Sequence, residues 1–506
     1  MAREASTRPI TWRTARLAAL AAVVAGAFPS TPWWRVNSSD NEIKIAVARS
    51  LLAGDGGSFP SHPTRWAYAL TSGRGGRIYS AYSLPTSLVH LPTVALENLG
   101  GPLVEGLPWM ALLAALAWLL VAWGERSGVS PPAAAVGAIL ACMGTALWPM
   151  AALGYDTTAE VVAMASLLWA GAGKSSAKRW LTAGAVFGVV LATRTTAVIL
   201  LPAALVLALL QLPRDPRSVL CRILWALLGA LPGVALALAY NYHRFGSPLD
   251  FKGSPLIPGV PPAEFVRYLV PLFSRAHLRG FAGLLVSPGK GVLWYSPPLV
   301  LALLLGVPLA RRFPSQVAAL ATFAVAAPLF YGTFVFWHGD WHWGPRYVAP
   351  IFLAAAPVGW LAYEWVTRRG APVRWLALLA AVAAVAFQAM PVANGEPVHS
   401  YLEVVIQPLR EQGRLLPWPR DRQPTQEEQA TVYFALENSP LWAVARANSL
   451  LLDNPTYRAF LMVRLAITAL APVCVGAILI HIARRRGTGA PGPEITEVAP
   501  RATPAP

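Results

Sequence analysis

Long runs of apolar residues constrain the fold of this chain more than any other feature of its sequence. Segments such as 107–123, 131–150 and 373–391 are built almost wholly from apolar residues. Crossing the hydrocarbon core of a bilayer takes about 17 to 25 such residues in a helix, and helices of soluble domains are seldom so uniformly apolar. Of the 506 residues, 55% are hydrophobic and 13% are charged, whereas a soluble domain carries about 25% charged residues. The sequence therefore predicts an all-α bundle of membrane-spanning helices.

The apolar runs predict about twelve spans. We place them near 14–31, 107–123, 131–150, 156–172, 179–193, 196–211, 222–241, 292–310, 315–336, 347–366, 373–391 and 459–483. The loops on one side of these spans hold clusters of basic residues, namely Lys174, Lys178, Arg179, Arg214, Arg217, Arg222, Arg311, Arg312, Arg368, Arg369, Arg374 and Arg484 to Arg486. Cytoplasmic loops carry an excess of Lys and Arg. Both chain ends are therefore predicted to be cytoplasmic, in an inner (plasma) membrane of bacterial type.

The first span admits a second interpretation. Arg13 and Arg16 precede an apolar run that ends Ala25-Gly26-Ala27, and this order also resembles a signal peptide with its cleavage site. An uncleaved helix is preferred, because the rest of the chain is itself a membrane domain and needs no separate export signal.

Four stretches are then external: 32–106, the turn around Asp156, 242–291 and 392–458. Within the first, the segment 84–99 is apolar but too short and too polar for a span, so it predicts an interfacial helix. Counting it as a span would place the basic loops outside, against the positive-inside rule. Residues 392–458 are predicted to form an external cap segment. The tail 484–506, rich in Pro, Ala and Gly, is predicted to be disordered.

The net charge of +17 does not predict nucleic-acid binding. The basic residues lie mostly in short loops between apolar runs rather than on one long basic surface. They are interpreted as topology signals, and membrane lipid, not nucleic acid, is the expected partner.

Two carboxylates follow the first span in the run NSSDNEIKIAVARSLLAGDGG. Asp40 and Glu42 stand two residues apart at the outer membrane surface, where a partly shielded carboxylate can act as a general base toward an alcohol or amine. The alternative is that Ser39, Asp40 or Asn41 simply caps the helix predicted to follow.

Aromatic and ionisable residues mark two further external positions. Tyr79 and Tyr82, in GRIYSAYSLP, suit a sugar or lipid headgroup, although an aromatic belt at the membrane interface explains them as well. Asp156 lies at the mouth of one hairpin and Arg194 at the tip of the next. Arg194 is flanked by apolar residues, so we expect it to have a carboxylate or phosphate partner.

The external stretch 242–291 is an exception to the charge rule, because it carries Arg267, Arg275, His277, Arg279 and Lys290. Basic residues in an external stretch run against the positive-inside bias, and an anionic ligand bound there would explain them. The run SPGKG that contains Lys290 lacks the frame of a nucleotide-binding P-loop.

The densest polar constellation is WHGDWHWGPRY, residues 337–347. His338, Asp340 and His342 alternate, which would allow a metal ligand set in an extended segment, and Arg346 could bind a phosphate in bidentate fashion. The three Trp residues in the same run also read as an interface anchor. A divalent metal is thus an option, and no cofactor is firmly predicted.

In their order along the chain these motifs resemble the GT-C superfamily of glycosyltransferases that use polyprenyl-phosphate sugars, near the protein O-mannosyltransferases and the lipid A aminoarabinose transferases. The resemblance covers 1–391, through the acid at Asp40, the continuation AVARSLLAGDGG, the Y-S-x-Y segment, Asp156, YNYHRFGSPLDF and HGDWHWGPRY. It implies a GT-C-like bundle whose large first external loop bears interfacial helices. Asp40 matches the catalytic base and Asp156 the supporting acid. Many members have an Asp-Glu pair where this chain has Asp40-Asn41, which leaves Glu42 as a rival.

The implied activity is transfer of a sugar from a polyprenyl-phosphate donor to a glycan, lipid or protein acceptor on the external face. A base removes the acceptor's proton as its oxygen attacks and inverts the anomeric carbon. Cations must meet the charge of the departing phosphate, and the candidates are Arg346, Lys290, Arg194, Arg275 and Arg279. Tyr79, Tyr82, His338, Asp340 and His342 are the expected substrate contacts. The alternative is a transporter or flippase of a lipid-linked anion, but the nearly apolar spans favour a surface reaction.

Overall fold

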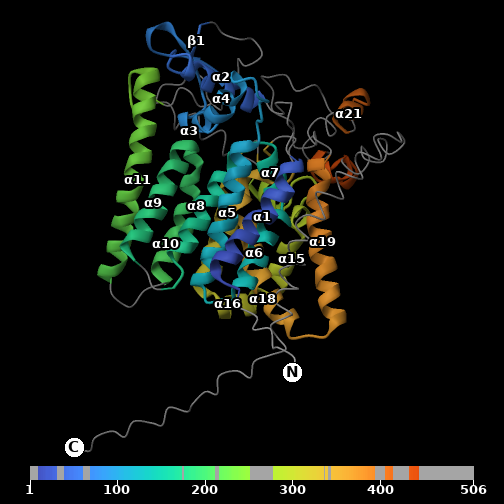
Figure 1. The fold of residues 1–506 in the computed structure, drawn as a ribbon. Coiled ribbons are helices and arrows are strands. Elements are labelled where there is room, and N and C mark those ends of the chain that lie inside the picture. Colours follow the sequence, from blue (N-terminus) through green and yellow to red (C-terminus); the bar gives the residue numbers. More distant parts are fainter. Residues whose placement is uncertain are drawn as a thin grey trace, which may run out of the picture.

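The computed structural model describes residues 10–30, 39–60, 69–173, 176–210, 216–250, 277–334, 337–339, 343–393, 405–413 and 432–443. Two layers are visible in it: a tall bundle of helices, and a layer of short helices and strands across one end (Figure 1).

The first half of the bundle consists of α1 (Trp12–Ser30), α5 (Leu107–Arg126), α6 (Pro131–Met143), α7 (Leu147–Ala152), α8 (Thr157–Ala170), α9 (Ala177–Thr193), η3 (Thr195–Leu200), α10 (Leu201–Leu210) and α11 (Pro216–Phe245). The second half consists of α13 (His277–Val286), α14 (Val292–Tyr295), α15 (Pro297–Leu304), α16 (Gly306–Arg312), α17 (Pro314–Gly332), η5 (Arg346–Ala354), α18 (Ala355–Thr367) and α19 (Ala371–Ala393).

Many of these helices are long and apolar, as predicted. Within the described residues, five are long and apolar enough to cross a membrane: α5, α11, α17, η5 together with α18, and α19. Shorter apolar helices of 10–17 residues are α6, α8 and η3 with α10. In α5, Pro108 occupies the first turn, where its missing N–H costs nothing. One large core of buried apolar side chains runs through the bundle.

Each predicted span before residue 392 coincides with a helical segment, which confirms the fold class. Four spans are not single α-helices. The span near 131–150 is divided between α6 and α7, and the one near 292–310 is divided among α14, α15 and α16. The spans near 196–211 and 347–366 begin as the 3-10 helices η3 and η5. The span near 459–483 and the tail 484–506 lie outside the described residues, so the total of twelve stays a prediction.

The end layer contains α2 (Ser39–Leu52), α3 (Leu84–Leu88) and α4 (Leu91–Asn98) (Figure 1). The segment 84–99 therefore forms two short helices instead of a span, as expected of an interfacial segment. A small sheet in the same layer, with strands β1 (Ser58–Phe59), β2 (Leu70–Ser72) and β3 (Ile78–Ser80), was not predicted. Its order is β1-β3-β2, with both pairings antiparallel. Strands of two or three residues are too short to give a period-2 pattern.

The described residues of the predicted basic loops lie at the other end of the bundle. The last turn of α11 reaches the end layer, because Arg244 donates to the carbonyl of Ser80 at 2.6 Å, so Arg217 and Arg222 in its first turns lie about 30 Å away or more. Likewise α16 and α18 end, and α9 and α19 begin, away from α2 (Figure 1). This arrangement agrees with the predicted threading, and which side is cytoplasmic stays a prediction.

Part of the predicted cap segment 392–458 is described, including α21 (Gln407–Glu411) and η7 (Leu436–Asn438). Ile406, Leu409 and Tyr433 are buried within the same apolar core as the bundle. The backbone N–H of Gly289 also donates to the carbonyl of Tyr433, at 2.9 Å. The described parts of the segment thus pack into the bundle.

Candidate active site

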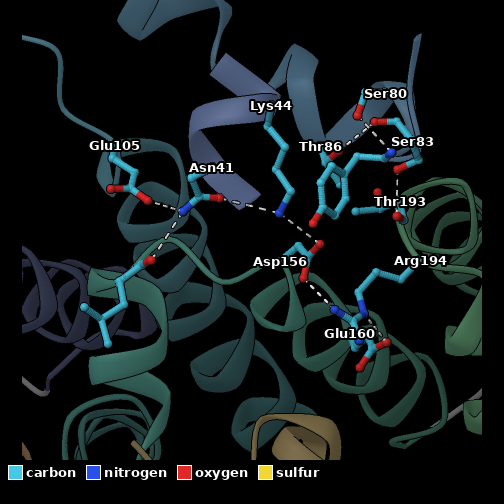
Figure 2. Close-up of polar contacts among 12 residues, drawn as sticks. Asn41, Lys44, Ser80, Ser83, Thr86, Glu105, Asp156, Glu160, Thr193 and Arg194 are labelled. Carbon is cyan, nitrogen blue, oxygen red and sulfur yellow. Dashed lines mark hydrogen bonds and ion pairs between the residues drawn. The ribbon is translucent and has the colours of Figure 1, made fainter. Parts of the chain in front are cut away.

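Asp156 stands where the end layer meets the bundle. It directly precedes α8, and its side chain is largely buried. Lys44 of α2 donates to Oδ2 at 3.3 Å, and Arg194, at the end of α9, donates to Oδ1 at 2.6 Å (Figure 2). One carboxylate therefore holds cations from both layers.

Arg194 also binds a second carboxylate. Its Nε donates to Oε1 of Glu160 at 2.9 Å, and Thr196 adds a hydrogen bond to the same oxygen at 3.3 Å. Asp156 and Glu160 are four residues apart at the start of α8, so they lie on one side of the chain. The expected partner of Arg194 is thus found to be a pair of carboxylates.

Asn41 extends this network toward α5. Its amide Nδ2 donates to Glu105 and, at 3.4 Å, to the carbonyl of Leu153. Its Oδ1 accepts a hydrogen bond from Lys44 at 3.5 Å. The structure therefore decides against Asn41 as a helix cap: α2 begins at Ser39, and the NH₂ group of Asn41 donates to residues outside α2.

Charge keeps Asp156 ionised. Burial alone would raise the pKa of this carboxyl group, but the positive charges of Lys44, Arg194 and Arg346 outweigh it and hold the pKa below its ordinary range. A carboxylate stabilised in this way is a weak base. Asp156 is better suited to organising cations than to accepting a proton.

Asp40 and Glu42 both lie in the first turn of α2, each partly buried. Successive residues of a helix are about 100° apart around its axis, so these two carboxylates point in opposite directions. Asp40 is four residues before Lys44 and shares its face. Helical geometry thus places Asp40, rather than Glu42, on the side of the helix that meets Asp156.

A second group of polar residues surrounds His338. Lys290 and Arg346 are both close enough to disfavour its charged form, and burial disfavours it more, so the pKa of His338 lies well below its usual value. Tyr433 stacks on the ring at 4.3 Å between centroids, and its hydroxyl bonds to Nδ1 at 2.7 Å. Lys290 is fully buried. We call Lys290, His338, Arg346 and Tyr433 the cationic group.

Arg346 joins the cationic group to Asp156. Its charge contributes to the low pKa of Asp156, and its guanidinium carbon lies 5.7 Å from the ring centre of Tyr155 and 5.2 Å from that of Tyr347. Gly339 has a φ of +63°, and a Cβ there would lie 3.0 Å from Nε of Arg346. Glycine at this position therefore gives the arginine room to lie across the turn.

Tyr79 and Tyr82, both predicted as substrate contacts, have different surroundings. Tyr79 is buried and packs edge-on against His243 and Phe245. Tyr82 is half-buried, and the ammonium of Lys44 lies 5.1 Å from its ring centre. Packing of the sheet accounts for Tyr79, while Tyr82 borders the Asp156 network.

The segment around Tyr82 is tied to the bundle through its main chain. Arg244 donates to the carbonyls of Ser80 and Tyr82, at 2.6 and 3.1 Å. The hydroxyl of Ser83 donates to the carbonyl of Thr193 at 2.7 Å. The ends of α9 and α11 thus fix the chain that carries Tyr82.

The remaining predicted residues lie apart from these contacts or outside the described ranges. Arg279 is exposed in the first turn of α13. Arg275, Asp340 and His342 lie outside the described residues. Within the described part of the chain, no group of three or more His, Cys, Asp or Glu side chains is placed to hold a metal ion. The predicted metal option depends on Asp340 and His342 and stays a prediction.

Sequence reasoning missed Lys44, Glu105 and Glu160. Spacing carried a signal for two of them, since Lys44 is four residues after Asp40 and Glu160 four after Asp156. No spacing signal pointed to Glu105, because its partner Asn41 is 64 residues away in the chain.

No family model and no curated protein sequence matches the chain. The chain is similar to the structure of ArnT from Cupriavidus metallidurans bound to undecaprenyl phosphate, with a TM-score of 0.47 and 16% identity over 95% of this chain and 79% of that one. It is also similar to the oligosaccharyltransferase of Archaeoglobus fulgidus with Zn and sulfate, with a TM-score of 0.42 and 14% identity over 73% of this chain. That match covers 52% of the oligosaccharyltransferase, so this chain spans about half its length.

Proposed function

We propose that the protein is an integral membrane glycosyltransferase that moves a sugar from a polyprenyl-phosphate donor to an acceptor at the α2 end of the bundle. The observation that carries the proposal is the position of Asp156. It is an ionised, buried carboxylate that holds Lys44 and Arg194, it lies near Arg346, and it faces the side of α2 that bears Asp40. The sequence motifs described above support the same function.

Asp40 is the proposed general base. It shares a helix face with Lys44, whereas Glu42 points away from that face. Asp156, whose negative charge is neutralised by neighbouring cations, organises those cations and leaves proton transfer to Asp40.

Arg346 and Lys290 are the proposed donor-phosphate contacts. Both lie beside His338, and two cations near a neutral ring stabilise an incoming anion. The acceptor oxygen attacks the anomeric carbon as the bond from that carbon to the phosphate oxygen breaks. The electron pair leaves with the phosphate, the proton passes to Asp40, and the configuration of the sugar inverts.

The distribution of buried charge favours this reaction over transport. Among the described residues, the buried side chains of Lys44, Glu105, Asp156, Glu160, Arg244 and Lys290 belong to segments near the end layer, while Arg179 lies in the first turn of α9. A translocation path needs ionisable groups along the depth of the membrane. Charge gathered at one end suits chemistry at the membrane surface.

The test uses purified protein in lipid nanodiscs and a panel of polyprenyl-phosphate sugars, with release of polyprenyl phosphate as the readout. We expect at least one donor to be cleaved, Asp40→Asn to reduce the rate by about 10³-fold or more, and Glu42→Gln to reduce it by less than about 5-fold. A rate unchanged in Asp40→Asn removes Asp40 from the mechanism. Movement of intact donor across proteoliposomes without cleavage would favour the transporter instead.

A further inference from the structure

Asn41 joins three separate segments of the chain. Its side chain is almost fully buried. Through its amide nitrogen Nδ2 it connects α2 to Glu105, in the connection that leads to α5 (Figure 2), and to the carbonyl of Leu153, in the turn between α7 and α8. One member of this junction, Asn41, directly follows Asp40 in sequence, and another, Leu153, is three residues before Asp156.

Two glycines allow the three segments of the junction to approach one another closely. Gly154 has a φ of +78°, and a Cβ there would overlap Nδ2 of Asn41. A Cβ on Gly106 would lie 2.7 Å from the carbonyl oxygen of Ala152. Real Cβ atoms do not come so near, so these two positions let the segments reach Asn41.

The hydrogen bonds of Asn41 have a defined direction. A carboxylate oxygen and a carbonyl oxygen can only accept, so the amide NH₂ faces Glu105 and Leu153. The amide oxygen then faces Lys44, whose ammonium can only donate. Lys44 in turn donates to Asp156. Glu105 thus sets the orientation of Asn41, and Asn41 helps to set the position of Lys44.

We propose that Glu105 is a positioning residue for the transfer reaction, which fixes the first turn of α2, and with it Asp40, over Asp156 through the Asn41 amide. The inference rests on the proposed function, because its consequence is a rate of transfer. Glu105 acts through Asn41 and makes no contact with the reacting atoms in this role. What matters is its acceptor oxygen at the right distance, not its charge.

Two conservative variants separate distance from charge. Glu105→Gln keeps the length and an acceptor oxygen but removes the charge, whereas Glu105→Asp keeps the charge and withdraws the oxygen. We expect Glu105→Gln to retain kcat within about 3-fold and Glu105→Asp to lower it about 30-fold, with the donor KM changed less than about 3-fold in both, since a displacement of about 1 Å can cost a large factor in rate. The reverse order of the two variants, or no loss in Glu105→Asp, overturns the proposal.

Glu97 provides the matched control. It also ties α2 to another segment, α4, through Arg49 at 2.8 Å, but from the last turn of α2, away from Asp40. Glu97→Asp is expected to leave kcat within about 2-fold, because exposed ion pairs contribute little. A loss equal to that of Glu105→Asp would mean that any tether of α2 matters, and would overturn the specific role of Glu105.

A second readout does not depend on transfer. In a background with the three native cysteines replaced by Ala, Asp40→Cys is treated with a maleimide, and its modification rate is compared between Glu105→Gln and Glu105→Asp. A faster rate with Glu105→Asp supports the positioning role, and equal rates overturn it. If the protein without substitutions cleaves no donor, the proposed function fails while this comparison still decides the inference.

Discussion

The Asp156 network and the cationic group differ in the residue at their centre. In the network that residue is a carboxylate: Lys44 and Arg194 both donate to Asp156, and Arg194 also donates to Glu160. In the cationic group it is a buried imidazole, His338, whose protonation the charges of Lys290 and Arg346 both disfavour. The first arrangement suits a structural role, because one carboxylate connects α2 to the bundle. The second suits the proposed binding of an anion, because two positive charges act at one uncharged ring.

Asp156→Asn should have the largest effect on stability, because it removes the carboxylate on which the network depends. Leaving buried cations without their partner costs about 3–5 kcal/mol of stability, and we expect transfer to fall by about 10²–10³-fold. The measurements are the thermal unfolding midpoint in detergent and donor cleavage. Glu125→Gln, which breaks the ion pair of Glu125 with Arg16 elsewhere in the bundle, is the control. Equal losses in the two variants would contradict a special role for the network.

Arg346→Ala should mainly weaken donor binding, as expected for a residue of the cationic group. We expect the Kd for polyprenyl phosphate to rise about 10–100-fold, with acceptor affinity and unfolding midpoint little changed. Arg346→Lys should recover part of the affinity, since it restores the charge but not the bidentate geometry. An unaltered donor Kd in Arg346→Ala would contradict the assignment.

Stability should fall in mild acid, because two buried histidines, His90 and His338, stay neutral in the folded chain. Burial and the nearby ammonium of Lys44 lower the pKa of His90 to about 3, and the pKa of His338 is lowered as well. The unfolded chain takes up these protons below about pH 6.5 and the folded chain does not. The free energy of unfolding should therefore decrease as the pH falls from about 6.5 to 5, by up to about 1.4 kcal/mol per pH unit for each histidine.

His90→Phe tests this dependence without touching the cationic group. The variant should lose about half of the pH slope, measured as unfolding midpoint against pH. His243→Phe, at an exposed position, is the control. A slope that is unchanged in His90→Phe would show that His90 does not contribute.

Tyr433→Phe should have the smallest effect of this series. It removes the hydrogen bond to Nδ1 of His338 but keeps the stacked ring, and one hydrogen bond is worth about 1 kcal/mol. We expect the donor Kd to rise about 2–5-fold, which corresponds to that energy. Tyr363→Phe in α18 should leave it unchanged. A loss as large as that of Arg346→Ala would mean that Tyr433 contacts the donor itself.

The helices were predicted well from the sequence, because a long apolar run by itself indicates a helix that is surrounded by lipid. The sequence also placed Asp156 and Arg194 at the same end of the bundle, and the two side chains are in contact there. That this end is external stays a prediction. The interruptions in the spans near 131–150 and 292–310 were not predicted, since composition stays apolar through the breaks. A hydropathy pattern records burial in lipid and does not record where a backbone bends.

Most of the site could not be predicted because its contacts join distant parts of the chain. Lys44 reaches Asp156 across 112 positions, and Asn41 reaches Glu105 across 64. From the sequence alone, a polar loop residue that faces water cannot be distinguished from one that faces a buried carboxylate. The proposal of Asp40 over Glu42 as the base also rests on the structure, because it depends on which side of α2 carries Lys44.

The segment that carries Tyr82 is held by its carbonyl groups, through Arg244 to residues 80 and 82. These hydrogen bonds involve backbone atoms of the loop, so they do not depend on which side chains the loop carries. Substitutions at position 82 can therefore change what borders the site while the loop stays docked. The contacts that hold the loop are therefore independent of the side chain at position 82. We expect natural variation or laboratory selection at this position to be able to alter the choice of substrate without displacing the loop.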